Sequence, residues 1–326
     1  MDSTVTFQEV AVLWLKHIKS TVAPSTYLEY HRVTEVHILP ALGNYTPSAV
    51  DSALLEKFMS DLSGAPSDPG RHPSPTTVKH IFTILRQILH FAAAEGFMPE
   101  VNTRAPRFRT PPSAGRCFQS SDIPVLTAFA EKGGIREYGI LLCLDMGLRI
   151  GELCALQWAD VDLENGILHV RKTVKRVENE QPGAQRCLMV IGEPKTRTSY
   201  RDIPIPDEIW ARLRTFRSEA GSDACYVLNG RSDRFVLPRS YEHSFATWLE
   251  KCGIPAINVH SLRHSFATRC LQYGCGLKPL SEMLGHSSVS TTLNLYIHSN
   301  MDEKRDAINT LTGKKNGIRR KTYRKK

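Results

Sequence analysis

Four cationic side chains lie within ten residues in the stretch HSLRHSFATR, which holds His260, Arg263, His264 and Arg269 and no acidic residue. On a helix, His260 and Arg263 lie one turn apart and share a face, whereas His264 directly follows Arg263 and points elsewhere. A guanidinium presents a rigid fork that matches phosphate oxygens, and an imidazole one turn away can donate a hydrogen bond or transfer a proton. The pair therefore indicates an anion clamp, with solvated surface cations as the alternative. We interpret His264 as structural and Arg269 as a backbone contact or surface charge.

Several other chemistries lack a residue that they require. His260 and His264 have the spacing of metal ligands, but Ser261 stands where a zinc protease has a glutamate. The chain has no G-x-S-x-G nucleophile turn and no Gly-rich loop of the kind that cradles nucleotide phosphates. The sequence thus argues against a metal site, a serine hydrolase and an ATPase, and it predicts no cofactor.

Three further segments carry side chains of matching chemistry. Arg149 follows a Gly-Leu turn and has Glu152 three residues on, one helical turn away, where a carboxylate can orient the guanidinium. Lys195 lies in EPKTRTSYRDIPIP, in the turn of an expected hairpin, where a long ammonium can reach over a groove. His286 lies at an expected helix end in LGH, and Tyr296 follows ten residues later. Together these segments strengthen the interpretation of an anion clamp.

This ordered set of side chains resembles the tyrosine recombinase (phage integrase) family, and TTLNLYIH is especially similar to integrases of conjugative transposons and temperate phages. The resemblance covers nearly the whole chain. It implies a mainly α fold with a small antiparallel β-sheet, in which an N-terminal four-helix core-DNA-binding domain precedes a tyrosine-recombinase catalytic domain. The residues that match the catalytic set of the family are Arg149, Lys195, His260, Arg263, His286 and Tyr296.

The resemblance implies a nucleophile and two proton-transfer groups. Tyr296 would attack a DNA phosphodiester and form a 3′-phosphotyrosyl bond, with release of a 5′-hydroxyl. Lys195 would protonate the departing 5′-oxygen, with Lys175 as a competing assignment, and His260 would act as the acid/base partner of the phosphate and Tyr296. The energy of the broken bond is kept in the new ester, so the reaction requires neither ATP nor a metal.

The remaining residues of the set would stabilise the transition state. Arg149 and Arg263 would hold the two non-bridging phosphate oxygens, and His286 would donate a further hydrogen bond to one of them. Glu152 would support the site by orienting Arg149. We interpret Arg201 as a backbone contact or surface charge rather than a catalytic group.

The same resemblance implies partners and leaves alternatives open. The expected function is integration and excision of a mobile element by a homotetramer on synapsed DNA, aided by an excisionase or a host DNA-bending factor. Many mobile-element integrases carry a further N-terminal domain, whereas this chain begins almost at once with the expected clamp domain. A chromosome-dimer-resolving recombinase therefore stays in play, as do a type IB topoisomerase and a non-catalytic DNA-binding protein.

Patterns of apolar residues indicate the elements that must position these groups. Helical spacing fills the first hundred residues, and Thr6 with Glu9 predicts a capping box at the first helix. Short β-rich runs at 166–176, 185–195 and 200–206 predict one small antiparallel sheet. We expect a core-DNA-binding domain at 1–98, a linker at 99–117, a catalytic domain at 118–312 and a basic tail at 313–326.

Charge and composition limit the classes of protein. The formal net charge is +9, but residues 314–326 hold eight Lys or Arg and no acid, and the rest of the chain carries only +1. The basic tail fits contact with a phosphate backbone. No apolar run approaches the length of a membrane span, and there is no export signal, so we expect a cytoplasmic protein with no membrane partner. The eight cysteines include no C-x-x-C pair, and we expect reduced, packed thiols. The expected helix at 301–311 would dock either in its own protomer or on a neighbouring one.

Overall fold

The computed structural model describes residues 5–63, 73–101, 118–179, 187–194 and 196–288. The chain divides into two compact units. The first comprises Met1–Ala114 and Lys175–Val190, and the second comprises Gly115–Val174 and Ile191–Lys326. The domain ranges expected from the sequence stay a prediction. Residues 175–190 group with the first unit, although they lie outside the range 1–98 expected for the first domain.

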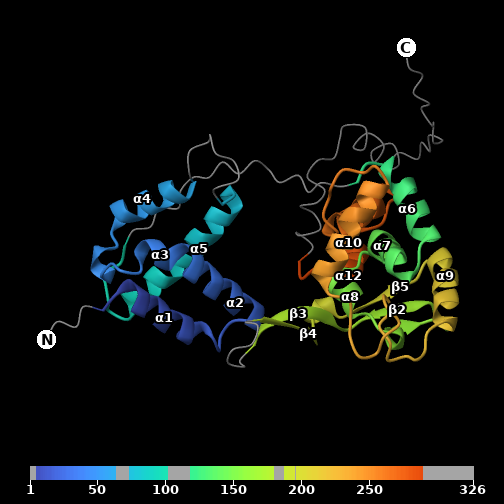
Figure 1. Ribbon diagram of the computed structural model, residues 1–326, viewed down its shortest axis with the longest axis horizontal. Coiled ribbons are helices and arrows are strands. Elements are labelled where there is room, and N and C mark those ends of the chain that lie inside the picture. The colour runs from blue at the N-terminus through green and yellow to red at the C-terminus, as the bar shows by residue number, and fades with distance from the viewer. Residues whose placement is uncertain (1–4, 64–72, 102–117, 180–186, 195, 289–326) are drawn as a thin grey trace, which may run out of the picture. The chain divides into compact units, whose positions relative to one another are not determined.

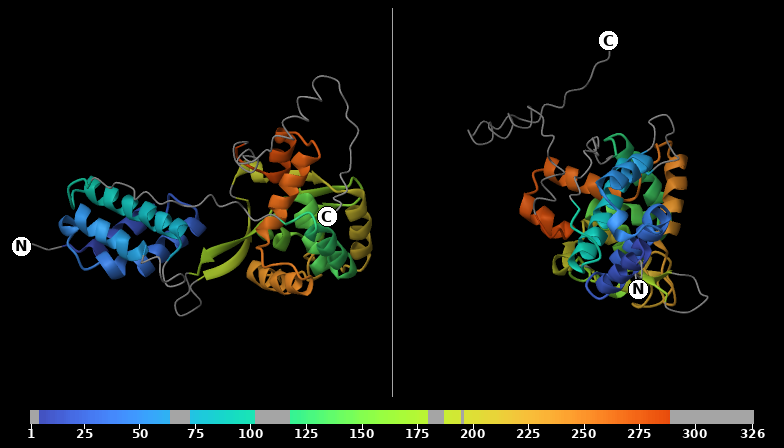
Figure 2. Two further views of the ribbon diagram at one scale, coloured as in Figure 1. Left: turned by 90° about the horizontal axis from the view of Figure 1, so that it is seen from above. Right: turned by 90° about the vertical axis from the view of Figure 1, so that its left-hand side faces the viewer.

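The first unit is a bundle of helices around one apolar core (Figures 1 and 2). The helices α1, α2 and α5 contact one another, and the core includes Phe7, Trp14, Ile81 and Leu85. Its helices are α1 (Phe7–Ile18), α2 (Pro24–Val33), a π-helical turn (Thr34–Ile38), α3 (Leu39–Leu42), a 3-10 turn (Pro47–Ala49), α4 (Ser52–Ser63) and α5 (Pro75–Ala94).

Local sequence signals explain where these helices begin and end. The predicted capping box is present, since Thr6 N donates to Glu9 Oε2 at 2.8 Å and Glu9 N donates to Thr6 Oγ1 at 3.3 Å. After α2, helical turns continue past Pro40 to Leu42, with Gly43 at the cap position, because proline is tolerated in the first turn of α3, where its missing N–H has no helical partner.

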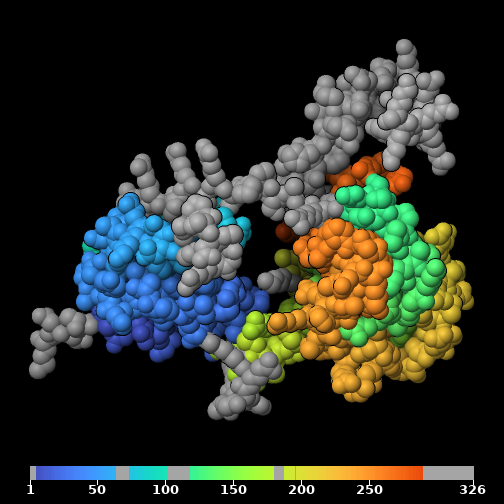
Figure 3. Space-filling model, turned by 45° about the horizontal axis from the view of Figure 1, so that its top comes forward, coloured from blue at the N-terminus to red at the C-terminus, as the bar shows by residue number. Residues whose placement is uncertain are grey.

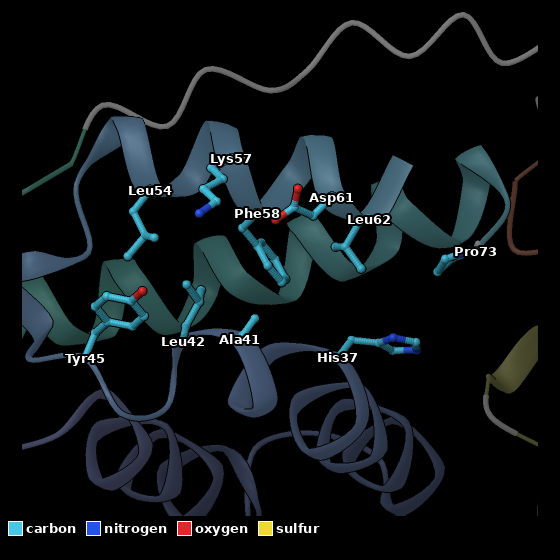
Figure 4. Close-up of a pocket in the computed structure, with 10 residues that line it drawn as sticks. All are labelled: His37, Ala41, Leu42, Tyr45, Leu54, Lys57, Phe58, Asp61, Leu62 and Pro73. Atoms are coloured by element: carbon cyan, nitrogen blue, oxygen red, sulfur yellow. The ribbon is translucent and has the colours of Figure 1, made fainter. Parts of the chain in front are cut away.

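The first unit also has a hollow between α3 and α4 of about 710 Å³ (Figure 4). Leu42 and Phe58 contribute apolar walls, and His37, Lys57 and Asp61 contribute polar groups. None of the site residues predicted from the sequence lines this hollow. It is therefore a feature of the helical unit in its own right, separate from the clamp residues.

The second unit is mainly helical. In the space-filling view its green residues around α6 lie against the orange residues around α10 (Figure 3). The helix α7 contacts both α6 and α11 and is buried along most of its length. The helices are α6 (Asp122–Lys132), α7 (Ile135–Met146), α8 (Ile150–Ala155), α9 (Asp207–Ser218), α10 (Pro238–Lys251), α11 (His260–Gln272) and α12 (Leu277–Leu284), with 3-10 turns at Trp158–Asp160 and Arg197–Ser199.

The strands form two sheets among the described residues, where the sequence predicted one. Strands β1 (Val161–Asp162), β2 (Ile167–Val170) and β5 (Arg201–Pro204) pair antiparallel in the order β1-β2-β5, with Leu168 opposite Ile203. Strands β3 (Thr173–Glu178) and β4 (Cys187–Gly192) form a separate pair. The run 166–176 is thus broken into β2 and β3.

The expected hairpin around residue 195 is wrong for the same reason. The flanking strands β4 and β5 belong to different sheets, so they do not form the two arms of one hairpin. Alternate residues of β2 and β5 are buried, including Leu168, Val170 and Ile203, whereas β4 has no buried residue. Burial of one face by the helices therefore selects β2 as the partner of β5.

A glycine at the end of α7 controls its approach to α11. Gly147 has a φ of 67°, and a Cβ built there would lie 2.6 Å from Phe266 Cδ1 and 3.1 Å from Leu284 Cδ2. We expect Gly147→Ala to lower the free energy of unfolding by about 2–4 kcal/mol, through left-handed backbone strain and overpacking. Urea unfolding followed by tryptophan fluorescence measures this change, because Trp158, Trp210 and Trp248 lie in the second unit and only Trp14 in the first.

Gly166→Ala is the matched control for that substitution. Gly166 also has a φ of 67°, but nothing lies within 4 Å of its added Cβ. The control should lose only the backbone contribution of about 1 kcal/mol. Equal losses in the two variants would show that the contact with Phe266 is unimportant.

Candidate active site

The described residues of the predicted site come from separate elements of the second unit, namely α8, α11 and the end of α12. Arg149 occupies the cap position before α8, directly after the turn at Gly147, and Glu152 lies in the first turn of that helix. Arg263 lies in the first turns of α11, which begins at His260. Residues 195 and 289–326 lie outside the described part of the chain, and the predicted Lys195 and Tyr296 are among them.

Three successive carbonyls at the end of α12 each accept a hydrogen bond from a different arginine. Arg201 Nε donates to Met283 O at 2.6 Å, Arg263 Nη2 donates to the carbonyl of residue 284, and Arg149 Nη2 donates to Gly285 O at 3.2 Å. The C-terminal end of a helix leaves such carbonyls without helical partners and carries partial negative charge. This helix end therefore gathers the three guanidinium groups in one place.

The same helix end fixes the backbone of His286. Gly285 has a φ of 61°, its N–H donates to Glu282 O at 3.0 Å, and the N–H of His286 donates to Ser281 O at 3.1 Å. This pattern is a Schellman turn, in which a glycine takes the left-handed conformation. His286 consequently leaves α12 in a defined direction, directly after the residue whose carbonyl binds Arg149.

Glu152 is the single carboxylate bonded to these arginines in the part of the chain that the structure describes. It is 4% exposed and accepts from Arg149 Nη1 at 2.8 Å, as well as from Arg201 Nη1 at 2.9 Å and Nη2 at 2.8 Å. Burial alone would raise the pKa of Glu152, but hydrogen bonds and charge from Arg201, with the charge of Arg149, lower it to about 2. Glu152 is therefore ionised at neutral pH.

Arg263 has no carboxylate partner among the described residues. It is 3% exposed, and its guanidinium donates to the carbonyls of Gly147, at 2.7 Å, and Leu284. Burial and the nearby charge of Arg149 lower its pKa to about 9. A buried cation paired only with neutral carbonyls lacks a counter-ion, and this site has the electrostatics that bind an anion.

The histidines of the site share this positive surrounding. The rings of His260 and His264 meet edge to face with centroids 4.6 Å apart. Burial, followed by the charges of His264 and Arg263, lowers the pKa of His260 to about 4. Burial and the charges of Arg263 and Arg149 lower the pKa of His286 to about 4. His260 and His286 are thus neutral at pH 7, where they can accept or donate a hydrogen bond.

The structure corrects one interpretation and adds one residue to the site. Arg201 was expected to be a backbone contact or surface charge, but it is 6% exposed and forms a two-pronged ion pair with Glu152. The sequence offered only a weak signal for this role, an arginine at the start of an apolar strand. Arg269 pairs with Asp145 at 2.7 Å, in keeping with a surface charge.

Among the described residues, no group of His, Cys, Asp and Glu has the arrangement of a metal site, and the seven cysteines there are free thiols. No described helix has the length and apolar character needed to cross a membrane.

Two models of known protein families match this chain. The model of the phage integrase family matches residues 116–303, and the model of the N-terminal SAM-like domain of phage integrases matches residues 6–63. The first match alone covers more than half of the chain. The chain belongs to the phage integrase family. It is a tyrosine recombinase.

Individual relatives of this recombinase include XerC-like tyrosine recombinases and transposon transposases. A XerC-like tyrosine recombinase of Caldanaerobacter subterraneus subsp. tengcongensis is 26% identical over 335 residues, covering 94% of this chain and 84% of the relative. The transposase from transposon Tn916 of Enterococcus faecalis is 28% identical over 190 residues, covering 54% of this chain and 45% of that protein.

Solved structures share the fold of this recombinase. The Tn1549 transposon integrase in complex with a circular intermediate DNA has a TM-score of 0.74 at 20% identity, covering 93% of this chain and 99% of that chain. The lambda integrase tetramer bound to a Holliday junction has a TM-score of 0.64 at 17% identity, covering 90% of this chain and 78% of that chain. The likenesses confirm a mainly helical fold with small antiparallel sheets.

The lowered histidine pKa values predict how stability of the recombinase depends on pH. His260 and His286 have pKa values of about 4 in the folded chain against 6.5 in ordinary surroundings. Between these values the unfolded chain binds more protons, so stability is fully present above pH 6.5 and falls as the pH drops toward 4. We expect the double variant His260→Gln/His286→Gln to show a shallower fall in the free energy of unfolding, measured by urea titration from pH 7 to 4.5.

His243 is exposed in α10, and His243→Gln provides the control for replacing a histidine with glutamine in this pH series. An unchanged slope in the double variant would show that His260 and His286 do not titrate with lowered pKa values.

Proposed function

We propose that the chain is a site-specific recombinase that integrates and excises a mobile DNA element through a 3′-phosphotyrosyl intermediate. The observation that carries the proposal is the charge of the site. Three guanidinium groups meet at the end of α12, and a single carboxylate, Glu152, is bonded to them among the described residues. The site therefore has a net positive charge that can be neutralised by one scissile phosphate, whose negative charge grows in the transition state.

The first chemical step forms one bond and breaks another at phosphorus. In this proposal the phenolic oxygen of Tyr296 attacks the phosphorus, and the bond to the 5′-oxygen breaks. His260 accepts the proton of Tyr296 through its neutral ring, and Lys195 protonates the leaving 5′-oxygen. Rejoining is the reverse reaction, in which a 5′-hydroxyl of the partner strand attacks the phosphotyrosyl ester. No external energy source is needed.

Arg149, Arg263 and His286 stabilise the charge that develops during this step. Arg149 and Arg263 each already donate to a carbonyl at the end of α12, so neither guanidinium needs to be reoriented when DNA binds. His286 leaves the same helix end and donates a hydrogen bond to one phosphate oxygen. Donors that are in place before the reaction lower the barrier more than donors that must move.

Several parts of the proposal concern domains and partners. The range 1–98 would bind the core site, 99–117 would follow the DNA as a linker, 118–312 would perform catalysis, and the basic tail at 313–326 would contact phosphates. The active assembly would be a homotetramer on two synapsed duplexes in the cytoplasm, with an excisionase or a host DNA-bending factor setting direction. The Tn1549 and lambda integrases, whose structures were solved in complex with DNA, share the fold of this chain and so support the proposed DNA-bound assembly.

A second function is favoured by a specific finding. The XerC-like relative covers 94% of this chain, so resolution of chromosome dimers is the alternative role for the same chemistry. Terminal repeats or a small excisionase reading frame beside the gene would support the mobile-element role. Without them, recombination between two identical chromosomal sites would support the resolver.

A nicked suicide duplex that carries the recombination site tests the chemistry directly. Loss of the short fragment after cleavage prevents rejoining, so the proposed recombinase accumulates as a covalent protein–DNA adduct. We expect the adduct to form without metal or ATP, and peptide mapping to place the DNA on Tyr296. Binding of the site without formation of an adduct would indicate a non-catalytic DNA-binding protein. Relaxation of any supercoiled plasmid, without a defined site, would indicate a topoisomerase.

A further inference from the structure

Among the described residues of the second unit, Arg201 is the most buried cation that the proposed mechanism does not use. It lies at the start of β5 and is 6% exposed, and its guanidinium donates to three different groups. Nη1 and Nη2 bind the two oxygens of Glu152 at 2.9 Å and 2.8 Å, Nε binds Met283 O at 2.6 Å, and Nη1 also reaches Ser199 O at 3.2 Å. Each nitrogen of the guanidinium therefore has at least one hydrogen-bond partner.

The carboxylate of Glu152 accepts hydrogen bonds from two arginines, and the two arginines bind it in different ways. Arg201 forms the two-pronged contact with Oε1 and Oε2. Arg149 contributes one guanidinium bond, from Nη1 to Oε1 at 2.8 Å, and one bond from its backbone N to Oε2 at 2.9 Å. A carboxylate can accept a full fork from only one arginine in this geometry, and here that arginine is Arg201.

Because Arg201 occupies both oxygens of Glu152, Arg149 keeps guanidinium donors that can bind a substrate. Its Nη2 reaches across to Gly285 O, and its side chain is 33% exposed, whereas those of Glu152 and Arg201 are each 4% exposed. Without Arg201, Glu152 would have both oxygens free for Arg149, whose guanidinium would turn into a two-pronged pair with it. The charge and donors of Arg149 would then be directed to Glu152 instead of to a phosphate.

Arg201 also holds the helix end from which His286 departs. A Cβ built on Gly285 would lie 3.1 Å from Arg201 Cδ and 3.0 Å from Thr198 O, so Arg201 packs directly against the turn. Its Nε binds the carbonyl of Met283 in the same turn. The groups that would touch the phosphate are therefore connected to Arg201 through Glu152 and through the end of α12.

We propose that Arg201 is a positioning residue for DNA cleavage, which occupies Glu152 so that Arg149 stays available to the scissile phosphate. The inference rests on the proposed function, since it concerns the same phosphate. Arg201 itself stays buried and does not touch DNA. Its role is to neutralise Glu152 and to keep a net positive charge of two among the three arginines and one carboxylate.

The test compares cleavage by the full chain with that of two variants on the suicide duplex. We expect Arg201→Met to slow adduct formation at saturating protein by about 100-fold while DNA affinity changes by less than about threefold. Adding Glu152→Gln removes the carboxylate that captures Arg149, so the double variant should cleave about tenfold faster than Arg201→Met alone. A purely structural role of Arg201 would make the double variant as slow as the single variant or slower.

Controls separate folding and the proposed function from this role. Arg217→Met removes an arginine that pairs with Asp223 at 2.6 Å on the surface of the same unit, and it should leave cleavage unchanged. If Arg201→Met does not fold, Arg201→Lys keeps the charge but binds one oxygen of Glu152 only, and its cleavage should still rise when Glu152→Gln is added. Failure of the unaltered chain to form an adduct would overturn the proposed function. An adduct from Arg201→Met at the normal rate would overturn only the role of Arg201, as would a double variant no faster than its single parent.

Discussion

Tyr296→Phe is expected to abolish formation of the covalent DNA adduct, with a loss of at least about 10⁴-fold in the cleavage rate. Phenylalanine keeps the ring but lacks the oxygen that would bond to phosphorus, so no phosphotyrosyl ester can form. Binding of the core site should stay within about threefold, because the phosphate contacts come from other residues. Gel separation of the adduct on the suicide duplex and fluorescence anisotropy of the intact duplex measure the two quantities.

Tyr273→Phe is the matched control for the nucleophile. Tyr273 lies at the end of α11 and is 87% exposed, so it is a tyrosine that solvent and DNA can reach. The control should form the adduct at the rate of the unaltered chain. An adduct formed by Tyr296→Phe would transfer the nucleophile to another residue, and peptide mapping of that adduct would identify it.

Arg263→Ala should slow cleavage by about 10³-fold, because it removes a guanidinium fork from the developing phosphorane. The structure gives a second reason for a large effect. Arg263 joins Gly147 O at the end of α7 to Leu284 O at the end of α12, so its loss also frees two turns that frame the site. Single-turnover cleavage at saturating protein measures the change, and thermal unfolding reports whether the second unit stays folded.

Two substitutions sharpen the interpretation of Arg263. Arg263→Lys keeps the charge, but one ammonium cannot reproduce the fork that binds both carbonyls, and we expect a loss of about 100-fold. Arg269→Ala removes a cation from the same helix, where it pairs with Asp145, and should leave cleavage within about threefold of normal. Normal cleavage by Arg263→Ala would contradict the anion clamp.

Local patterns were sufficient for most helices, because their determinants are close in sequence. Thr6 and Glu9 cap α1 as predicted, and Gly147 and Gly285 end α7 and α12 in left-handed turns. Local sequence patterns could not predict which strands share a sheet, since an apolar strand of four to six residues pairs with whichever neighbour buries its face. The separation of β2 from β3 therefore appeared only in the structure.

For the site, residue type and order along the chain determined which groups belong together. The order of Arg149, His260, Arg263 and His286 was sufficient to indicate a phosphate clamp, because few reactions combine these groups. The structure brings the three described elements that carry them to one helix end, whereas Lys195 and Tyr296 lie outside the described residues and keep their roles as proposals.

The sequence by itself determined the family and the helical periodicity, and it predicted the chemistry of the clamp, since each depends on residue type and local spacing. Only the tertiary structure decided how the charges are shared. Arg201 and Glu152 are 49 residues apart in the chain, and Met283, Leu284 and Gly285 contribute backbone carbonyls that have no signature in a sequence. Burial makes such long-range contacts strong, because in the protein interior a charge without a partner is costly. For this reason a residue interpreted from the sequence as a surface charge became the partner of the buried carboxylate.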